Sequence, residues 1–489
     1  MIHRLHGIKQ AAGRHRRCRH LALLAGAGAL SLAAAACGSS GASTASAGPA
    51  LKTFSWTAAK GQTINLMLNE HNYEKALVDQ LPQFEKQTGI TVHYEVIPEE
   101  TYFTKLSTAL SSKNGSPDAF MTGVYQMWSY ATAGYMQNLS ALLSKHGWTS
   151  PSYDLSDYIP GVLAGDRWDL KVGDPAGTGP LWALPMGWEN YVITYNKKAF
   201  AKAGIKLPFT SLQNLASAAA KLKGWNGPGS YGICVRGYRG WGTIHPDVMS
   251  LMNEWGATDL TIKNGHLHAA MDSPQAIAMT RTWAQMVRNG GEPGFNTYDW
   301  PQCQTDLGDG KAAMIYDADI LGFFTDLPGA YATSGSLADT PPPPGPNGKI
   351  SSNEWIWSLA MNSSSHHKLA TWLLMQWMTG KQHDLWGALH GLLVDNPRES
   401  VANNPSFIAY EKKVEPGYHT LFGKMSKVAA IRFTPEPDFF QAATEWASML
   451  ENIVAGSTTA HAGLTSLAHS LDTTMATVPV TGHMLSGSS

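Results

Sequence analysis

The sequence predicts an α/β protein with two lobes. Residues 64–123 alternate apolar, strand-like runs with helical segments whose apolar residues recur every three or four positions. A second observation is the long apolar and aromatic run over 182–195, which changes abruptly into a short helical segment. About 430 residues follow the N-terminal region, enough for two or three ordinary domains with sizeable cores. These features indicate two α/β lobes joined by crossing segments.

The first lobe is expected to open with a βαβαβ unit. Ile90, Val92, Tyr94 and Val96 alternate with polar residues as in a strand, and the neighbouring helical segments carry apolar residues on one face. This order implies a parallel sheet with helices on both faces. The expected elements are a strand over 64–69, a helix over 73–88, a strand over 90–96, a helix over 101–112 and a strand over 119–123.

The segment 180–205 is the most informative part of the chain. Residues 182–195 are apolar, aromatic and β-branched, which suits a buried strand. A helix is then expected from Asn196, with Gly204 as its C-terminal stop. We expect this strand to leave one lobe and to bring the chain into the other.

Polar residues follow the predicted strands of the first lobe. The carboxyl ends of parallel strands meet at one edge of a sheet, and open α/β sheets bind their ligands beyond that edge. The residues expected to share this crevice are Asn69, Glu70 and His71 after the first strand, Glu99 and Glu100 after the second, and 124–126 after the third.

Several phrases, in their order and spacing, resemble one protein family. The crossover contains YNK, a short helix and AGI, and the opening lobe contains LPQFEKQTGITVHYEVIPEETYFTKLSTAL and SPDAFMTGVYQMWSYATAGYMQNL. Later phrases are RGYRGWG, GKAAMIYDADILGFFT, EWIWSLA and KLATWLLMQWMTGKQHDLWGALHGLLVDN. Over residues 64–450 the chain resembles the family 1 extracellular solute-binding proteins of bacterial ABC importers, a maltose-binding-protein-like family that takes up sugars and polyols.

The resemblance implies a periplasmic-binding-protein-like fold of type II, with two α/β lobes, a ligand cleft and hinge crossovers. The implied lobes are 61–193 plus 358–398 (N-terminal) and 194–357 plus 399–485 (C-terminal), with crossings near 192–195, 357–360 and 394–401. The stretch 145–179 is longer and richer in Asp, Gly and Pro than the family pattern, so we expect a surface insertion there.

The resemblance also implies a binding protein without catalytic activity or cofactor. It would capture a sugar or polyol by closing its lobes, act as a monomer, and dock on membrane permease subunits. A separate subunit would hydrolyse ATP. Net charge is −1 and charged residues make up 15% of the chain, so nothing points to nucleic acid.

A polyol site needs carboxylates and amides for hydroxyl groups, and aromatic faces for C–H surfaces. A Trp in so apolar a chain is more often a core residue than a ligand platform, and a buried acid can instead form a structural ion pair. The resemblance places Tyr125, Gln126, Trp241 and Asp317 on the family's ligand loops. The full set of candidates is Asn69, Glu70, Tyr125, Gln126, Trp188, Glu189, Trp241, Asp317, Asp319, Trp355 and Trp357.

The rival interpretation is a secreted glycoside hydrolase or another carbohydrate-active protein. Such an enzyme also needs aromatic platforms, and Asp317 with Glu189 are conceivable as its two carboxylates. The sequence contains no HExxH, GxSxG or GxxxxGK[ST] motif. The histidine pairs at 266 and 268 and at 366 and 367 are interpreted as solvated surface, and no metal site is expected.

The N-terminus predicts export and anchoring to the cell membrane. A basic region is followed by the charge-free apolar run 21–36 and by Cys37, so residues 1–37 are interpreted as a signal peptide with a lipobox. Cys37 is then the acylated, palmitate-bearing first residue of the mature lipoprotein; simple cleavage is the alternative, because Ala34 occupies a position where a branched residue is usual. Residues 38–60 are rich in Gly, Ala, Ser and Thr and predict a flexible tether.

Two cysteines remain after the signal and lipobox. Cys234 and Cys303 would both be exposed to an oxidising compartment, where thiols can pair. Their spacing does not decide the matter, so a disulfide and two free thiols both stay open.

Overall fold

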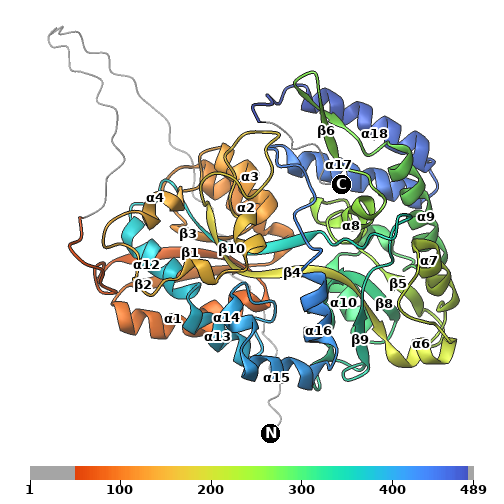
Figure 1. Ribbon diagram of the computed structural model, residues 1–489, viewed down its shortest axis with the longest axis horizontal. Coiled ribbons are helices and arrows are strands. Elements are labelled where there is room, and N and C mark those ends of the chain that lie inside the picture. The colour runs from red at the N-terminus through yellow and green to blue at the C-terminus, as the bar shows by residue number, and fades with distance from the viewer. Residues whose placement is uncertain (1–49, 483–489) are drawn as a thin grey trace, which may run out of the picture. The chain divides into compact units, whose positions relative to one another are not determined.

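The computed structural model describes residues 50–482, which belong to one compact unit (Figure 1). The predicted signal peptide, Cys37 and the tether up to residue 49 lie outside the described residues. The prediction of a flexible tether is wrong for residues 50–60, because Phe54 and Trp56 pack against the core and Ala59 is 2% exposed.

The chain opens with the predicted βαβαβ unit. Its elements are β1 (Thr63–Asn69), α1 (Asn72–Thr88), β2 (Thr91–Ile97), α2 (Glu99–Ser111) and β3 (Ala119–Gly123). β1 is parallel to both β2 and β3, which confirms the parallel sheet expected from the alternating pattern. Each element begins and ends within two residues of its expected position, because its periodicity is local and its ends carry turn residues.

A single long strand, β4 (Ala183–Asn196), belongs to both lobes (Figure 1). Residues 183–190 pair with β10 (Glu354–Met361), which also pairs with β3. Residues 191–196 pair with β8 (Ala312–Ala318) and β9 (Leu337–Thr340). All but one residue of β4 are buried, which explains its continuous apolar sequence. We call the β2-β1-β3-β10 side the N-lobe and the β8-β5 side the C-lobe, where β5 is Tyr231–Cys234.

Helices cover both lobes. In the N-lobe these are α3 (Val124–Thr132), α4 (Leu139–Leu143), α5 (Pro160–Gly165), α12 (Lys368–Met378), α13 (Lys381–Leu389), α14 (Glu399–Ala402) and α15 (Pro405–Val414). In the C-lobe they are α6 (Lys197–Ala203), α7 (Leu212–Lys221), α8 (Asp247–Glu254), α9 (Pro274–Gly290), α10 (Trp300–Gly308), α11 (Asp319–Asp326), α16 (Tyr418–Met425), α17 (Phe439–Val454) and α18 (Ala460–Met475), with the hairpin β6 (Leu260–Lys263) and β7 (His266–Ala269). Short 3-10 turns lie at Leu155–Asp157, Trp241–Thr243 and Phe295–Thr297.

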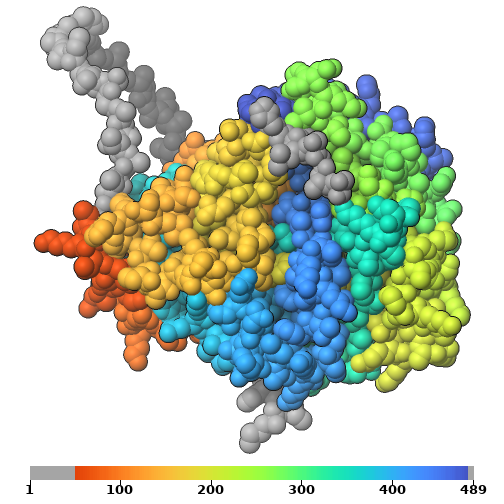
Figure 2. Space-filling view, in the orientation of Figure 1, coloured from red at the N-terminus to blue at the C-terminus, as the bar shows by residue number. Residues whose placement is uncertain are grey.

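Strand pairing and helix contacts place the first two crossings a few residues from their expected positions and the last one beyond residue 414. The partner of β4 changes between Asn190 and Tyr191, not over 192–195. β10 already pairs with the N-lobe half of β4 at Glu354, so the second crossing precedes that residue. α14 and α15 contact α13, whereas α16 contacts β9, so the last passage follows α15 and not 394–401. In Figure 2 the blue segment of α15 and α16 runs along the seam between the lobes.

The stretch 145–179 is not the expected surface insertion. Trp148, Tyr158 and Trp168 within it are fully buried. Arg398 lies behind this stretch, where its guanidinium is 3.4 Å from Asp157 and 4.0 Å from the centre of the Tyr158 ring. The stretch is therefore part of the N-lobe core. Its many Asp, Gly and Pro residues predicted a surface loop, although buried aromatic residues lie between them.

Among the helices of residues 50–482, none combines the length and the apolar character that a membrane crossing requires.

Candidate functional site

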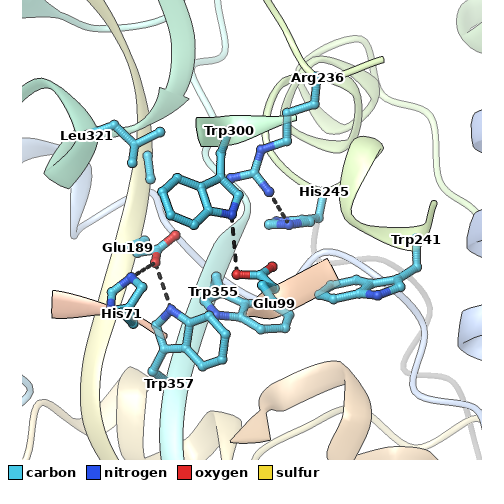
Figure 3. Close-up of a pocket in the computed structure, with 11 residues that line it drawn as sticks. His71, Glu99, Glu189, Arg236, Trp241, His245, Trp300, Leu321, Trp355 and Trp357 are labelled. Atoms are coloured by element: carbon cyan, nitrogen blue, oxygen red, sulfur yellow. Dashed lines mark hydrogen bonds and ion pairs between the residues drawn. The ribbon is translucent and has the colours of Figure 1, made fainter. Parts of the chain in front are cut away.

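A pocket with about 330 Å³ of empty space lies between the lobes, beside the crossing strand β4 (Figure 3). The N-lobe contributes side chains that follow β1, begin α2 or lie in β4 and β10. The C-lobe contributes the segment after β5, the first residue of α10, the end of β8 and part of α11. The lining residues are His71, Glu99, Glu189, Arg236, Trp241, His245, Trp300, Ala318, Leu321, Trp355 and Trp357.

Cross-strand pairing brings three of these side chains to one face of the sheet. Glu189 of β4 lies opposite Trp355 of β10, and Trp357 lies opposite Gly187. Residues two apart on a strand share a face, so Glu189 and both indoles point the same way. Gly187 has no room for a side chain, because a Cβ there would lie 2.1 Å from the Tyr73 ring.

Glu189 is the buried acid at the centre of this face. The indole nitrogen of Trp357 donates a hydrogen bond of 2.9 Å to its Oε1. Burial raises the pKa of Glu189 to about 8, although Arg236 and the Trp357 hydrogen bond favour the ionised form. The carboxyl group can therefore change its protonation state near neutral pH.

His71 faces Glu189 as a neutral ring. It is the N-cap of α1, and its Nδ1 accepts the backbone N–H of Tyr73 at 3.2 Å. The proton of the neutral ring is therefore on Nε2, which lies 3.7 Å from Oε1 of Glu189. Burial, with a smaller effect from Lys75, lowers the pKa of His71 to about 3.

Glu99 connects the two lobes across the pocket. It is the first residue of α2, and its Oε2 accepts hydrogen bonds from Asn69 Nδ2 and from Trp300 Nε1, both at 3.2 Å. Burial raises the pKa of Glu99 to about 7. Because Trp300 belongs to the C-lobe, its hydrogen bond to Glu99 forms only when the lobes are close together (Figure 3).

Arg236 is the cation of the site, and Asp317 at the end of β8 fixes its position. Nε donates to Oδ2 at 2.9 Å and Nη2 to Oδ1 at 2.6 Å, which is a bidentate pair of two buried side chains. Nη1 lies 3.1 Å from Nε2 of His245. Burial and the charge of Arg236 lower the pKa of His245 well below its usual value, so this ring is neutral and accepts from the guanidinium.

Indole rings form the apolar walls of the pocket. Trp241 and Trp355 stack with centroids 5.2 Å apart at 26°, and Trp357 meets Trp355 edge-on at 5.0 Å. Trp300 completes the set from α10. Flat apolar faces alternating with two carboxyl groups and one guanidinium suit a ligand that carries both C–H surfaces and many hydroxyl groups.

Four of the sequence-predicted residues line the pocket: Glu189, Trp241, Trp355 and Trp357. Two more do not line the pocket but bind residues that do: Asn69 donates a hydrogen bond to Glu99, and Asp317 accepts one from Arg236.

The remaining five candidates lie away from the pocket lining. The side chain of Glu70 is exposed, and Trp188 packs edge-on against Phe422 at 5.2 Å. The Tyr125 hydroxyl donates to the backbone oxygen of Glu354 at 2.7 Å. Gln126 is buried behind Trp355, and Asp319 accepts the backbone N–H of Asn190 at 3.2 Å.

Seven lining residues were not among the candidates. His71 and Glu99 follow predicted strands, so the strand-end rule had placed them in the crevice without selecting them. Arg236 and His245 flank the chosen Trp241. Only contacts in the folded chain distinguish them, that of Arg236 with Asp317 and that of His245 with the guanidinium. Trp300 is the first residue of α10, after the N-cap Asp299. This capping pattern predicts where the helix begins, but it does not predict that Trp300 contacts a ligand. Ala318 and Leu321 are apolar residues at the end of β8 and in α11, with no signal of their own.

Cys234 and Cys303 form a disulfide in the structure. It links the end of β5 to α10, the two elements that lead to Arg236 and Trp300.

One histidine of each pair named above lies beside a carboxylate. His268 lies 3.5 Å from Asp472 and His367 lies 3.1 Å from Asp118. Within the described part of the chain, no group of three or more His, Cys, Asp or Glu side chains has the arrangement of a metal site.

The sequence profile of a protein family, described as bacterial extracellular solute-binding protein, matches residues 69–384. An erythritol/L-threitol-binding protein of Mycolicibacterium smegmatis is 39% identical over 440 residues, which cover 88% of this chain and 91% of the relative. A mannitol-binding protein of Pseudomonas aeruginosa is 26% identical over 66% of this chain and 67% of its own length.

Solved structures are similar over nearly their whole length. An ABC transporter solute-binding protein of Agrobacterium radiobacter in complex with ribitol has a TM-score of 0.72 at 20% identity, covering 85% of this chain and 99% of its own. One from Agrobacterium vitis with bound D-mannitol has a TM-score of 0.72 at 21% identity, covering 86% and 100%. This likeness confirms the predicted type II, two-lobed α/β fold.

Proposed function

The chain belongs to the bacterial extracellular solute-binding proteins, and from this premise we propose that it captures a short acyclic polyol for import by an ABC transporter. The pocket between the lobes carries the proposal, because it sets four indole faces around two carboxyl groups and a guanidinium. The empty space of about 330 Å³ includes the open mouth of the pocket, so the enclosed part is small, which favours a small ligand over an oligosaccharide. The 39% identical erythritol/L-threitol-binding relative supports a four-carbon polyol as the first candidate.

In this proposal the protein acts by lobe closure and not by catalysis. The N-lobe carries one half of the ligand-contacting set, namely His71, Glu99, Glu189 and the two β10 indoles. The C-lobe carries the other half, namely Arg236, Trp241 and Trp300. A ligand that contacts both sets binds the closed state better than the open one and shifts the population toward it. The Trp300–Glu99 hydrogen bond adds a direct link between the lobes in that state. The closed protein then docks on permease subunits, and ATP is hydrolysed elsewhere.

Nothing in the pocket favours the glycoside hydrolase alternative. Both carboxylate oxygens of Asp317 accept from Arg236, and Oδ1 also accepts the backbone N–H of Ala318 at 2.8 Å. A carboxylate engaged in this way is a poor general acid or nucleophile, so the pair of Asp317 with Glu189 is not available for hydrolysis.

A thermal-shift screen over tetritols, pentitols, hexitols, monosaccharides and disaccharides tests the proposed function. A ligand present at 100 times its Kd stabilises the fold by about 2.7 kcal/mol, which is a clear shift of the melting temperature. We expect a short polyol to give the largest shift and to be recovered unchanged. The proposal fails if no polyol or sugar shifts the transition, and hydrolysis of an oligosaccharide would instead support the enzyme.

We also propose that a lipid on Cys37 anchors the mature protein outside the cytoplasm. Cys37→Ser should move the protein from the membrane fraction to the soluble fraction, because the acyl anchor is lost. Fractionation followed by immunoblotting measures the change. A variant that stays with the membranes like the wild type would show that this residue is not the anchor.

Binding of the polyol should release protons. In the closed pocket without ligand, burial raises the pKa of Glu189 to about 8 and that of Glu99 to about 7. Hydroxyl groups that donate to an ionised carboxylate form charge-assisted hydrogen bonds, so the ligand favours the ionised form and lowers both pKa values. Affinity should therefore rise as the pH increases through the range 7 to 8, and level off above it.

Calorimetry in buffers of different ionisation enthalpy measures this proton release. Glu189→Gln is the control, since it should remove the contribution of Glu189 and leave that of Glu99. Affinity that is constant with pH, or that increases toward acidic pH, would contradict the role given to the two carboxyl groups.

A further inference from the structure

A second cavity lies on the N-lobe, apart from the pocket between the lobes. It has about 1220 Å³ of empty space and shares no lining residue with that pocket. Its lining comes from the C-terminal half of α1, residues 150–154, and the junction of α12 with α13. Helix α1 contacts both α12 and α13 (Figure 1). Gln80 and Gln87 lie about 14 and 24 Å along α1 from His71, at 1.5 Å per residue. We call this cavity the N-lobe groove.

Planar aromatic and amide side chains dominate the N-lobe groove. The aromatic residues are Trp56, Tyr153, Trp377 and Trp386, all half-buried, so one part of each ring packs on the protein and another part faces outward. Five glutamines line the same groove, namely Gln80, Gln83, Gln87, Gln376 and Gln382. Amide groups both donate and accept, so they suit hydroxyl groups, whereas the rings suit C–H faces.

The charges of the groove are paired with one another. Lys381 lies 3.1 Å from Asp154 and 3.5 Å from Asp157. Arg398, which is fully buried, contacts Asp157 at 3.4 Å and Asp384 at 3.2 Å. With its cations and anions compensated, the groove offers little to a charged ligand and favours a neutral one.

A buried histidine in the wall leaves one acceptor unused. Nδ1 of His383 lies 3.0 Å from Oε1 of Gln80, which can only accept, so the ring proton is on Nδ1. Burial lowers the pKa of His383 to about 3, so the ring is neutral. Its Nε2 is a buried acceptor with no hydrogen-bond partner among residues 50–482. A buried acceptor without a partner is costly, and a hydroxyl group would supply the missing donor.

We propose that the N-lobe groove is a second ligand site, which binds a neutral oligosaccharide independently of the pocket between the lobes. The rings would cover sugar faces, Gln83 and Gln382 at the rim would bond hydroxyl groups, and one hydroxyl would donate to Nε2 of His383. The larger volume of the groove suits several sugar rings, whereas the pocket between the lobes suits one small molecule.

The test uses maltotriose, cellotriose and chitotriose as probes of the full mature protein. Saturation-transfer NMR detects binding, and calorimetry gives Kd. We expect at least one probe to bind saturably, both in the wild type and in Glu189→Gln. Trp386→Ala should weaken that binding about tenfold through the loss of a sugar platform. The double variant Gln83→Ala with Gln382→Ala should weaken it about fivefold, and because both side chains are exposed its fold should be unaffected.

Gln213→Ala is the matched control, since Gln213 is an exposed glutamine on α7 of the C-lobe. It should leave probe binding unchanged. The proposal is overturned if none of the three probes binds, or if binding is lost in Glu189→Gln and kept in the groove variants. Binding of the groove to permease subunits with no binding of any oligosaccharide would overturn it as well.

Discussion

Asp317→Ala should lower the free energy of unfolding by about 3–5 kcal/mol, the loss typical when one partner of a buried ion pair is removed. Asp317 and Arg236 are 1% and 4% exposed, and Asp317 accepts from both Nε and Nη2 of the guanidinium. Without the carboxylate, a buried cation loses its nearest counter-charge and two hydrogen bonds, and it keeps only the ion pair with Asp299 at 3.8 Å. Chemical denaturation followed by tryptophan fluorescence measures the change.

Two further variants separate this explanation from a general loss of packing. Asp309→Ala removes an exposed aspartate at the end of α10 and should change stability by less than about 0.5 kcal/mol. The double change Arg236→Met with Asp317→Leu removes both members of the bidentate pair and leaves only the longer contact of Arg236 with Asp299, at 3.8 Å, without its partner, so it should regain much of the lost stability. An Asp317→Ala variant as stable as the wild type would show that the pair does not hold Arg236 in place.

This result would also redefine the role of Asp317 in the site. The sequence suggested direct ligand contact, because the residue follows an apolar strand and lies in a phrase similar to the family's ligand segment. In the structure its oxygens are occupied by Arg236, and Arg236 reaches the pocket instead. Weaker polyol binding by the variant would therefore be indirect and would accompany the loss of stability.

The fold was predictable where its signals are local. The βαβαβ unit and β4 follow from the periodicity of apolar residues and from the turn residues between them, and both are within a few residues of expectation. The last crossing was misplaced, because α14 and α15 are short helices whose assignment to a lobe depends on contacts with α13. Contacts between segments that are distant in the sequence produce no periodic pattern of residues, so they cannot be predicted from periodicity.

The site was predictable only in part, because side-chain direction depends on strand register. Trp188 and Glu189 are adjacent in β4 and point to opposite faces, so Glu189 enters the pocket and Trp188 packs against Phe422. Trp355 and Trp357 are two residues apart and share the pocket face. A strand-end rule selects the neighbourhood of a site, whereas a register off by one residue would exchange every side chain in it.

Replacing both Cys234 and Cys303 by alanine should destabilise the protein by about 4 kcal/mol, since the disulfide closes a loop whose ends are 69 residues apart. The same change should weaken polyol binding. Cys234 precedes Arg236 by two residues, and Cys303 follows Trp300 by three. The disulfide therefore links, covalently, two segments that line the pocket from the C-lobe.

Denaturation midpoints and calorimetry, each with and without a phosphine reductant, measure both effects. The wild type should lose stability and affinity when reduced, whereas the double variant should not respond to the reductant. Intact-mass analysis after alkylation in denaturant should find no free thiol in the unreduced mature protein. Two alkylated thiols there, or equal midpoints for wild type and variant, would contradict the disulfide. If stability falls while affinity is unchanged, the bond stabilises the C-lobe without positioning the two residues. The contact with Asp317 would then position Arg236, and the contact with Glu99 would position Trp300.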